Sequence, residues 1–264
     1  MKMPNYIIEP FGAYKSIIEH PYIANKAVEV AVFHEHRLAF YYWSLWTKGV
    51  INGRSLDKPP ILVSFDWHED TVSPDDHEKQ ELEKLTNSQS KLVTLANEIA
   101  LFSWLKLNPL NDGHILSAAY QNLISDIFIV CKQEHDINIP FTDMYGNVHH
   151  IYSSHNANDM YKALSKHLEV DKIYLDIDLD YFTESTDSCG GGKNVTLNPP
   201  SEIQALLSPN SDLMQFILKR LAGMTIAIEP GFCDGYTNAH SIYQVIEKTM
   251  FEGQLLSEKI NFKK

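Results

Sequence analysis

Short apolar runs alternate with longer stretches of helical periodicity along this chain, and this alternation limits the folds that it can adopt. The apolar runs cover residues 28–33, 61–66, 126–131, 172–178 and 224–229, with a weaker run at 148–152. Most of them are apolar at successive positions, as strands buried on both faces must be. Helical spacing of apolar residues covers 78–106, 201–221 and the segment after Thr237. We therefore predict an α/β fold, a three-layer α/β/α sandwich around a mostly parallel central sheet.

Composition narrows the class of protein. The chain has 264 residues, of which 44% are hydrophobic, and we expect a single domain over residues 1–264. A formal net charge of −12 argues against a protein that binds nucleic acid along its phosphates, and it suits a cationic substrate. No apolar run reaches the ~20 residues of a membrane span and no secretion signal is recognisable, so we expect a cytoplasmic protein that does not bind membranes.

The cysteines do not indicate a thiol-based site. Cys131, Cys189 and Cys233 are odd in number and widely spaced, and none of them belongs to a C-x-x-C pair. Neither a disulfide framework nor a thiolate zinc site is therefore expected, which agrees with a reducing compartment.

Acidic residues and histidines gather where the predicted strands end. The run 61–65 leads directly into Asp66, His68 and Asp70 at alternate positions. Alternate side chains of an extended segment share one face, so these three side chains can point at one site. The alternative reading is a strand that runs into an acidic, solvated turn.

A second acidic run carries a stronger signal. Asp176, Asp178 and Asp180 alternate with bulky apolar residues in a strand-like segment. Carboxylates along a half-buried face lose hydration and repel one another unless a cation neutralises them. An edge strand with one solvated acidic face is the alternative, and the apolar neighbours Leu175 and Ile177 argue against it.

Two further predicted strands end in polar residues. His34 and His36 follow the run 28–33, and Glu229 ends the last run. Taken singly, such a histidine is more often a surface residue than a ligand, and the carboxylate can equally cap the turn or bind a cation. Taken together, carboxylates and imidazoles without thiolates favour manganese over structural zinc, and the number of acids implies two ions with bridging carboxylates.

In this order, the motifs resemble those of the arginase, or ureohydrolase, superfamily, and they span nearly the whole chain. The matching segments are residues 35–39, the D-x-H-x-D run 66–70, a looser N-x-G-H run at 111–114, the D-x-D run 176–178, and Glu229 with Pro230. Residues 175–182 and 234–237 look closer still to a divergent arginase-like family that includes peptide arginases, which convert arginine to ornithine in ribosomally made peptides.

The chain also departs from the arginase pattern. Arg37 stands where a serine is usual, and Asp180, Tyr181 and Phe182 follow D-x-D where arginases have a further acid and a proline. The long segment between Asp70 and His114 replaces a compact loop that, in arginases, grips the α-amino and α-carboxylate groups of free arginine. This favours an arginine within a peptide as substrate.

The resemblance implies a role for each site residue. One Mn²⁺ would bind His36, Asp66, Asp70 and Asp176, and a second would bind His68, Asp66, Asp176 and Asp178. Glu229 would pair with the guanidinium group, and His114, with His34 as a substitute, would pass a proton to the leaving amine. Asp70, Glu229 and His114 are thus the expected catalytic residues. The products would be urea and an ornithine side chain, the partner an arginine-containing precursor peptide, and a homo-oligomer remains open.

Three alternatives remain. The first is another metal-dependent amidine or amide hydrolase on the same fold, with agmatinase-like or deacetylase-like activity. The second is an arginase-like protein that binds metal without catalysis. The third, a dinuclear phosphoesterase, also uses D-x-H but needs G-N-H and G-H-x-H elements that this chain lacks.

Overall fold

The computed structural model describes residues 6–49, 58–133, 140–167, 169–187, 190–255, 257 and 260–263. A seven-stranded sheet forms its centre, in the order β1-β2-β11-β8-β3-β4-β7. Its strands are β1 (Tyr14–Glu19), β2 (Ala27–Phe33), β3 (Ile61–Asp66), β4 (Ile127–Cys131), β7 (Ile151–Ser154), β8 (Ile173–Asp178) and β11 (Leu221–Ala227). All neighbouring strands pair in parallel except β1 and β2, which are antiparallel.

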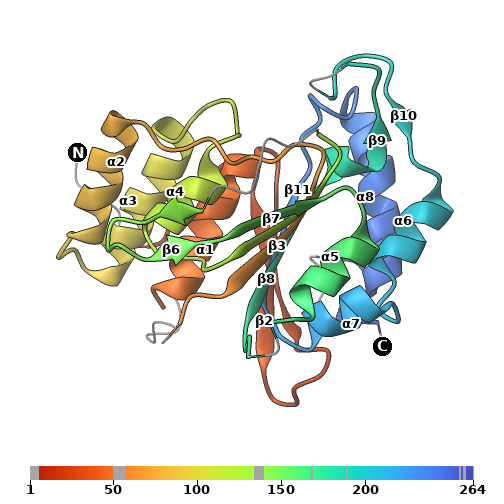
Figure 1. Cartoon of the computed structure of the whole chain (residues 1–264), viewed down its shortest axis with the longest axis horizontal. Coiled ribbons are helices and arrows are strands. Elements are labelled where there is room, and N and C mark those ends of the chain that lie inside the picture. Colours follow the sequence, from red (N-terminus) through yellow and green to blue (C-terminus); the bar gives the residue numbers. More distant parts are fainter. Residues whose placement is uncertain are drawn as a thin grey trace.

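Helices cover both faces of this sheet (Figure 1). One layer contains α1 (Ala39–Thr47), α2 (Asp76–Thr86), α3 (Leu92–Leu105) and α4 (His114–Tyr120). The opposite layer contains α5 (Ala157–Leu164), α6 (Pro200–Leu207), α7 (Asp212–Leu218) and α8 (Tyr236–Met250). The two faces of the sheet form separate apolar cores, each closed by one helix layer. The predicted α/β/α sandwich with a mostly parallel sheet is confirmed.

Short elements complete the described chain. They are the 3-10 turns η1 (His36–Leu38) and η2 (Leu179–Phe182) and the paired strands β5 (Phe141–Thr142) with β6 (Val148–His149), β9 (Thr183–Glu184) with β10 (Thr196–Leu197), and β12 (Phe251–Glu252) with β13 (Asn261–Phe262). Within the described ranges, no helix combines the length and apolarity that crossing a membrane requires. Cys131 and Cys233 are buried, whereas Cys189 lies outside the described residues.

The predicted strands match the observed ones to within one or two residues, except at the last run and at the edges. Strand β11 begins at Leu221 and ends at Ala227, so Glu229 lies in the turn beyond it. The weak run 148–152 divides between β6 and β7. Strand β1 was not predicted, because an edge strand with exposed charged positions lacks the apolar continuity that marks a buried one.

Two predicted helices are each broken in two. The stretch 78–106 forms α2 and α3, separated by the polar residues 87–91, and the stretch 201–221 forms α6 and α7. Pro209 lies at the second break, where its ring cannot donate a backbone hydrogen bond, and the Ser211 side chain caps the new helix at Met214. Apolar periodicity continued across both breaks, and so it did not reveal them.

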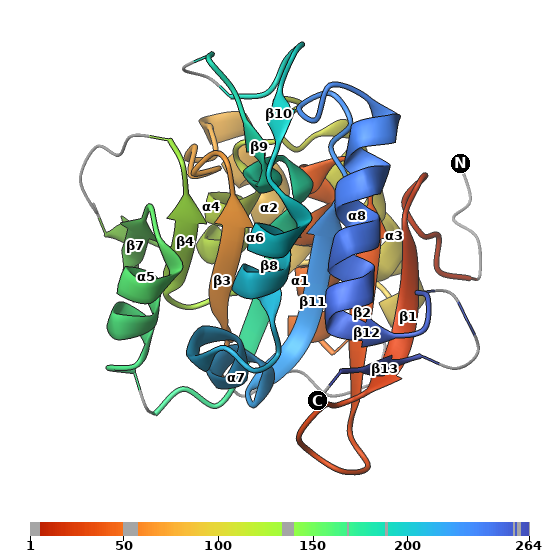
Figure 2. The same cartoon turned by 90° about the vertical axis from the view of Figure 1, so that its right-hand side faces the viewer.

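The direction of the parallel strands determines where the site forms. Strands β3, β4 and β11 end at the same edge of the sheet, from which β9 and β10 project (Figure 2). In open α/β sheets, ligands bind at the carboxyl ends of the strands. The residues that follow β2, β3, β8 and β11 are those in which the sequence concentrates its acids and histidines.

Candidate metal centre

Three segments bring buried polar side chains to this edge of the sheet. Asp66 is the last residue of β3, Asp178 is the last residue of β8, and His36 opens the 3-10 turn that follows β2. All three side chains are almost completely buried. Asp70 joins them from the turn after β3, where its φ of 50° is a conformation that Asp adopts more readily than most residues.

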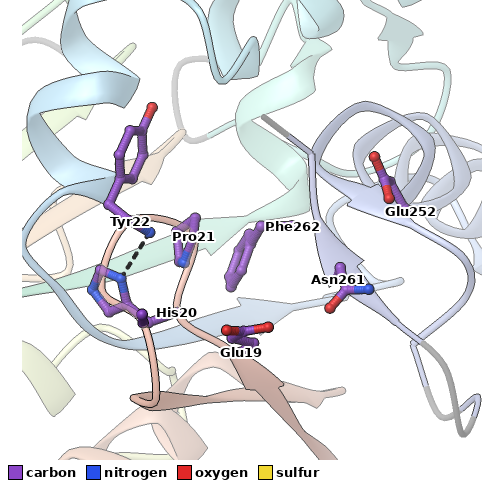
Figure 3. Close-up of a pocket in the computed structure, with 8 residues that line it drawn as sticks. Glu19, His20, Pro21, Tyr22, Glu252, Asn261 and Phe262 are labelled. Atoms are coloured by element: carbon purple, nitrogen blue, oxygen red, sulfur yellow. Dashed lines mark hydrogen bonds between the residues drawn. The ribbon is translucent and has the colours of Figure 1, made fainter.

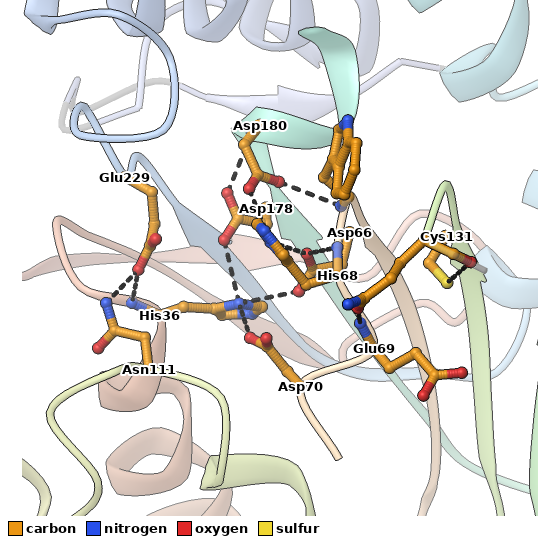
Figure 4. Close-up of polar contacts among 12 residues, drawn as sticks. His36, Asp66, His68, Glu69, Asp70, Asn111, Cys131, Asp178, Asp180 and Glu229 are labelled. Carbon is orange, nitrogen blue, oxygen red and sulfur yellow. Dashed lines mark hydrogen bonds and ion pairs between the residues drawn. The ribbon is translucent and has the colours of Figure 1, made fainter. Parts of the chain in front are cut away.

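The His36 ring is the centre of a first group of ligand-type atoms (Figure 4). Its Nδ1 atom lies 3.1 Å from Asp66 Oδ2, 3.0 Å from Asp70 Oδ2 and 3.1 Å from Asp178 Oδ2. One ring nitrogen cannot donate to three carboxylates. Among the described residues, Nδ1 and Asp66 Oδ2 are both buried without a hydrogen-bond partner. Three carboxylate oxygens therefore surround one ring nitrogen.

Asp176 lies on the other side of the same ring. Its Oδ2 atom is 2.7 Å from His36 Nε2 and accepts a hydrogen bond of 2.8 Å from the Ser64 hydroxyl. Its Oδ1 atom accepts a 2.5 Å hydrogen bond from the Thr225 hydroxyl. The resemblance had implied a ligand shared by both ions, but the structure places Asp176 behind His36. There it holds the Nε2–H tautomer and leaves the Nδ1 lone pair available for a cation.

A second group forms around His68. Its Nδ1 atom lies 3.1 Å from Asp180 Oδ2 and 3.5 Å from Asp66 Oδ1. Asp180 belongs to η2 and is fully buried, and the backbone N–H of Trp67 donates to its Oδ1 atom. Its own N–H donates to Asp178 Oδ1. Asp180 was not among the predicted ligands, although the D-x-D-x-D alternation contained it.

The charges of the two groups call for cations. Six buried carboxylates meet here, and the ion pairs found for them in the described residues are all with histidines. Burial and neighbouring carboxylates raise the pKa of Asp70 and of Asp178 well above the usual range. Ligand atoms of three overlapping groups lie within 4.8 Å of one another: His36 with Asp66 and Asp178, His36 with Asp70 and His114, and Asp66 with His68 and Asp70. Carboxylate oxygens and imidazole nitrogens suit Mn²⁺ and similar divalent ions.

Glu229 stands beside this centre in the turn after β11. Its Oε1 atom accepts hydrogen bonds from the backbone N–H of His36, at 2.7 Å, and from Asn111 Nδ2, at 2.6 Å. Its φ of 36° is unusual for a glutamate, and such conformations gather at functional sites. Burial raises the pKa of Glu229 to about 7.

The two histidines expected to move a proton differ in burial, because His34 is only half-buried. His114 is fully buried, its ring packs 4.2 Å from that of His36, and its Nδ1 atom lies 2.9 Å from the carbonyl oxygen of Asn111. Burial lowers the pKa of His114 to about 3. His34 packs against Tyr236 with 5.6 Å between ring centroids. Neither histidine is among the described residues that line the adjacent cavity.

That cavity has a volume of about 500 Å³ and opens beside both groups. Its lining is His68, Glu69, Asp70, Thr71, Val72, Leu110, Asn111, Asp112, Gln133, Asp178, Glu229 and Phe232. Five of these side chains are acidic, and no Lys or Arg stands among the described lining residues. The cavity therefore favours a cationic ligand.

Comparison with known proteins finds remote structural likenesses. No protein-family model and no curated protein matches the sequence. Among solved structures, proclavaminate amidino hydrolase from Streptomyces clavuligerus is 12% identical with a TM-score of 0.44, and the match covers 81% of this chain and 59% of that one. Helicobacter pylori arginase is 14% identical with a TM-score of 0.39, covering 81% and 72%. This chain thus spans less than two thirds of the first protein's length.

Proposed function

We propose that this chain is a hydrolase that holds two divalent cations, Mn²⁺ by preference, and removes the guanidino carbon of an arginine side chain within a peptide as urea. The observation that carries the proposal is the convergence of buried carboxylates and imidazoles from separate strand ends on one acidic cavity. Folding such a cluster is costly unless cations offset its charge.

The ligand atoms divide into two sets. One cation would be held by His36 Nδ1 with Asp66, Asp70 and Asp178, whose oxygens already lie within 3.1 Å of that nitrogen. The other would be held by His68 Nδ1 and Asp180, with Asp66 and Asp178 shared between the two. When bound, such a pair supplies Lewis acidity, which lowers the pKa of water at the site to near neutrality.

The protein's own groups would select the substrate. Glu229 is held at the cavity wall through Oε1, so its carboxylate can pair with the N–H groups of a guanidinium. A neutral amide, the substrate of a deacetylase-like enzyme, would leave this buried carboxylate without a partner. The acidic lining favours the guanidinium for the same reason.

The lining also distinguishes peptidyl from free arginine. Free arginine carries an α-carboxylate, and the described lining residues include five acids and no Lys or Arg to pair with it. An arginine in a peptide has no such charge. We therefore expect the enzyme to prefer an arginine whose backbone groups are blocked.

Mass spectrometry of products tests the proposal. The manganese-loaded protein is incubated with a peptide that contains one arginine and is blocked at both ends, with agmatine, and with free arginine. Hydrolysis to ornithine and urea lowers the peptide mass by ~42 Da, and urea appears in equal amount. Agmatine turnover without peptide turnover would favour the agmatinase-like alternative. Tight metal binding without any urea would favour the non-catalytic protein.

A further inference from the structure

We infer that Asn111 completes the guanidinium-binding end of this site by holding Glu229 in place and by accepting a substrate N–H with its own side-chain oxygen. The inference rests on the proposed function and names a specificity residue for it. In Figure 4, Asn111 and Glu229 lie side by side at one end of the cluster, away from His68.

The loop between α3 and α4 is built to present this side chain. Asn111 has a φ of 64°, a left-handed conformation that asparagine tolerates better than most residues. The backbone N–H of Asn108 donates to Glu78 Oε1 of α2 at 2.8 Å, and the N–H of Val72 donates to the carbonyl of Asp112 at 2.9 Å. The loop is therefore attached both to the helix layer and to the turn that carries Asp70.

His114 supports the backbone of Asn111 through a hydrogen bond. Its Nδ1 atom lies 2.9 Å from the Asn111 carbonyl oxygen, and because a carbonyl only accepts, Nδ1 must carry the hydrogen. The imidazole is fully buried against His36. A histidine in this position supports the loop backbone, and the proposal gives it that role in place of proton transfer.

The side-chain contacts leave two acceptors for a ligand. Both hydrogen bonds to the Glu229 carboxylate in the described structure use Oε1: one comes from the His36 backbone and one from Asn111 Nδ2. Asn111 Oδ1 is buried and has no hydrogen-bond partner among the described residues. An unpaired buried acceptor is costly, and a guanidinium presents several N–H donors in a fixed planar fork that can serve more than one acceptor.

An ammonium ion would use these acceptors less well, because it is a point charge without the planar fork. If Asn111 accepts a hydrogen bond from the guanidinium, loss of its side chain should weaken guanidinium binding more than ammonium binding. If it only stabilises the loop, both cations should lose affinity together. This difference makes the inference testable.

The decisive variant is Asn111→Gly, which removes the amide and keeps a residue that accepts a positive φ. Asn122→Gly is the matched control, since Asn122 also has a positive φ, 55°, and is not part of the cavity lining. On the manganese-loaded proteins, calorimetry measures the binding of methylguanidine and of methylamine. Metal content, and KM and kcat for the blocked arginine peptide, are measured on the same samples.

We expect Asn111→Gly to weaken methylguanidine binding about tenfold or more, with a much smaller change for methylamine. KM should rise more than kcat falls, bound manganese should not change, and Asn122→Gly should match the wild type. In a cycle with Glu229→Gln, the two substitutions should be non-additive, because Asn111 acts partly through Glu229.

The inference is overturned if Asn111→Gly binds methylguanidine as the wild type does, weakens both cations equally, or loses metal. If the wild type releases urea while the variant behaves normally, the proposed function stands and the role of Asn111 fails. If the wild type binds methylguanidine through Asn111 but releases no urea, the role of Asn111 stands and the proposed function fails. A wild type that does not bind methylguanidine overturns both.

Discussion

Two pockets of similar volume on this protein differ in whether their acidic side chains are buried. The cavity at the candidate metal centre measures about 500 Å³, and a pocket between the β1–β2 turn and the C-terminal segment measures about 410 Å³. In the second pocket, His20 Nδ1 accepts hydrogen bonds from the backbone N–H groups of Tyr22 and Ile23, at 3.1 and 3.0 Å, while Glu19 and Glu252 are exposed to water (Figure 3).

The difference shows which feature marks a candidate site. Exposed acids beside His20 keep their hydration, and the Nδ1 of that histidine is used by its own turn. Asp66 and Asp178 are almost completely buried, and His36 Nδ1 and Asp66 Oδ2 approach without a hydrogen bond. Buried charge that the protein leaves uncompensated requires a ligand, whereas volume alone does not.

The largest expected effect comes from removing a shared ligand. Asp178→Ala should abolish both metal binding and turnover, because Asp178 would contact both cations. Metal content by mass spectrometry and urea release check this. Asp143→Ala removes another buried aspartate, in the turn that contacts Asn147 and His149, and should leave metal content unchanged. An Asp178→Ala protein that keeps full activity would refute the site.

Glu229→Gln should have the next largest effect. The carboxamide keeps the shape of the side chain but loses the charge that pairs with a guanidinium, so kcat/KM should fall about a hundredfold. Bound metal should not change, because Glu229 is outside both proposed ligand sets. Steady-state kinetics with the blocked peptide measure the effect, and loss of metal in this variant would assign Glu229 to the centre itself.

Asp176→Asn distinguishes a supporting carboxylate from a ligand. Because Asp176 contacts His36 Nε2, its replacement should lower metal affinity by about 10–100-fold without abolishing binding. Calorimetric titration with Mn²⁺ gives the affinity. A complete loss equal to that of Asp178→Ala would restore Asp176 as a direct ligand.

Metal should also stabilise the fold. At a Mn²⁺ concentration a hundred times the Kd, binding contributes about 2.7 kcal/mol, which corresponds to a rise in Tm of about 5–10 °C for a chain of this size. Differential scanning calorimetry with metal and with a chelator measures the shift. The Asp178→Ala protein should show no such rise, and a rise equal to that of the wild type would place the bound metal elsewhere.

The smallest effect is expected in the other pocket. His20→Ala leaves two backbone N–H groups without their acceptor, which should cost about 1 kcal/mol of unfolding free energy. Turnover should stay within about twofold of the wild type once the variant is folded. Denaturant unfolding measures the unfolding free energy, and urea release measures turnover. A large loss of turnover would show that the second pocket also contributes to activity.

The architecture was largely predictable from sequence. Strands buried on both faces are nearly continuously apolar, so β2, β3, β4 and β8 are recognisable from residue type. Helix ends were less predictable from sequence. The breaks at residues 87–91 and 208–211 depend on capping and on local packing that apolar periodicity does not encode.

The site was predictable in its chemistry and less so in its geometry. Residue types and spacing determined that acids and histidines would meet at the carboxyl ends of parallel strands, since strand direction places those ends together.

The tertiary structure decided which acids face the cavity. Strand β8 ends at Asp178 and continues as a 3-10 turn, which places Asp176 behind His36 and brings Asp180 to His68. Only the packing of α2, α3 and the following loop against the sheet brings Asn111 to Glu229, 118 residues away in sequence. Such pairings arise from long-range packing, which local residue patterns cannot specify.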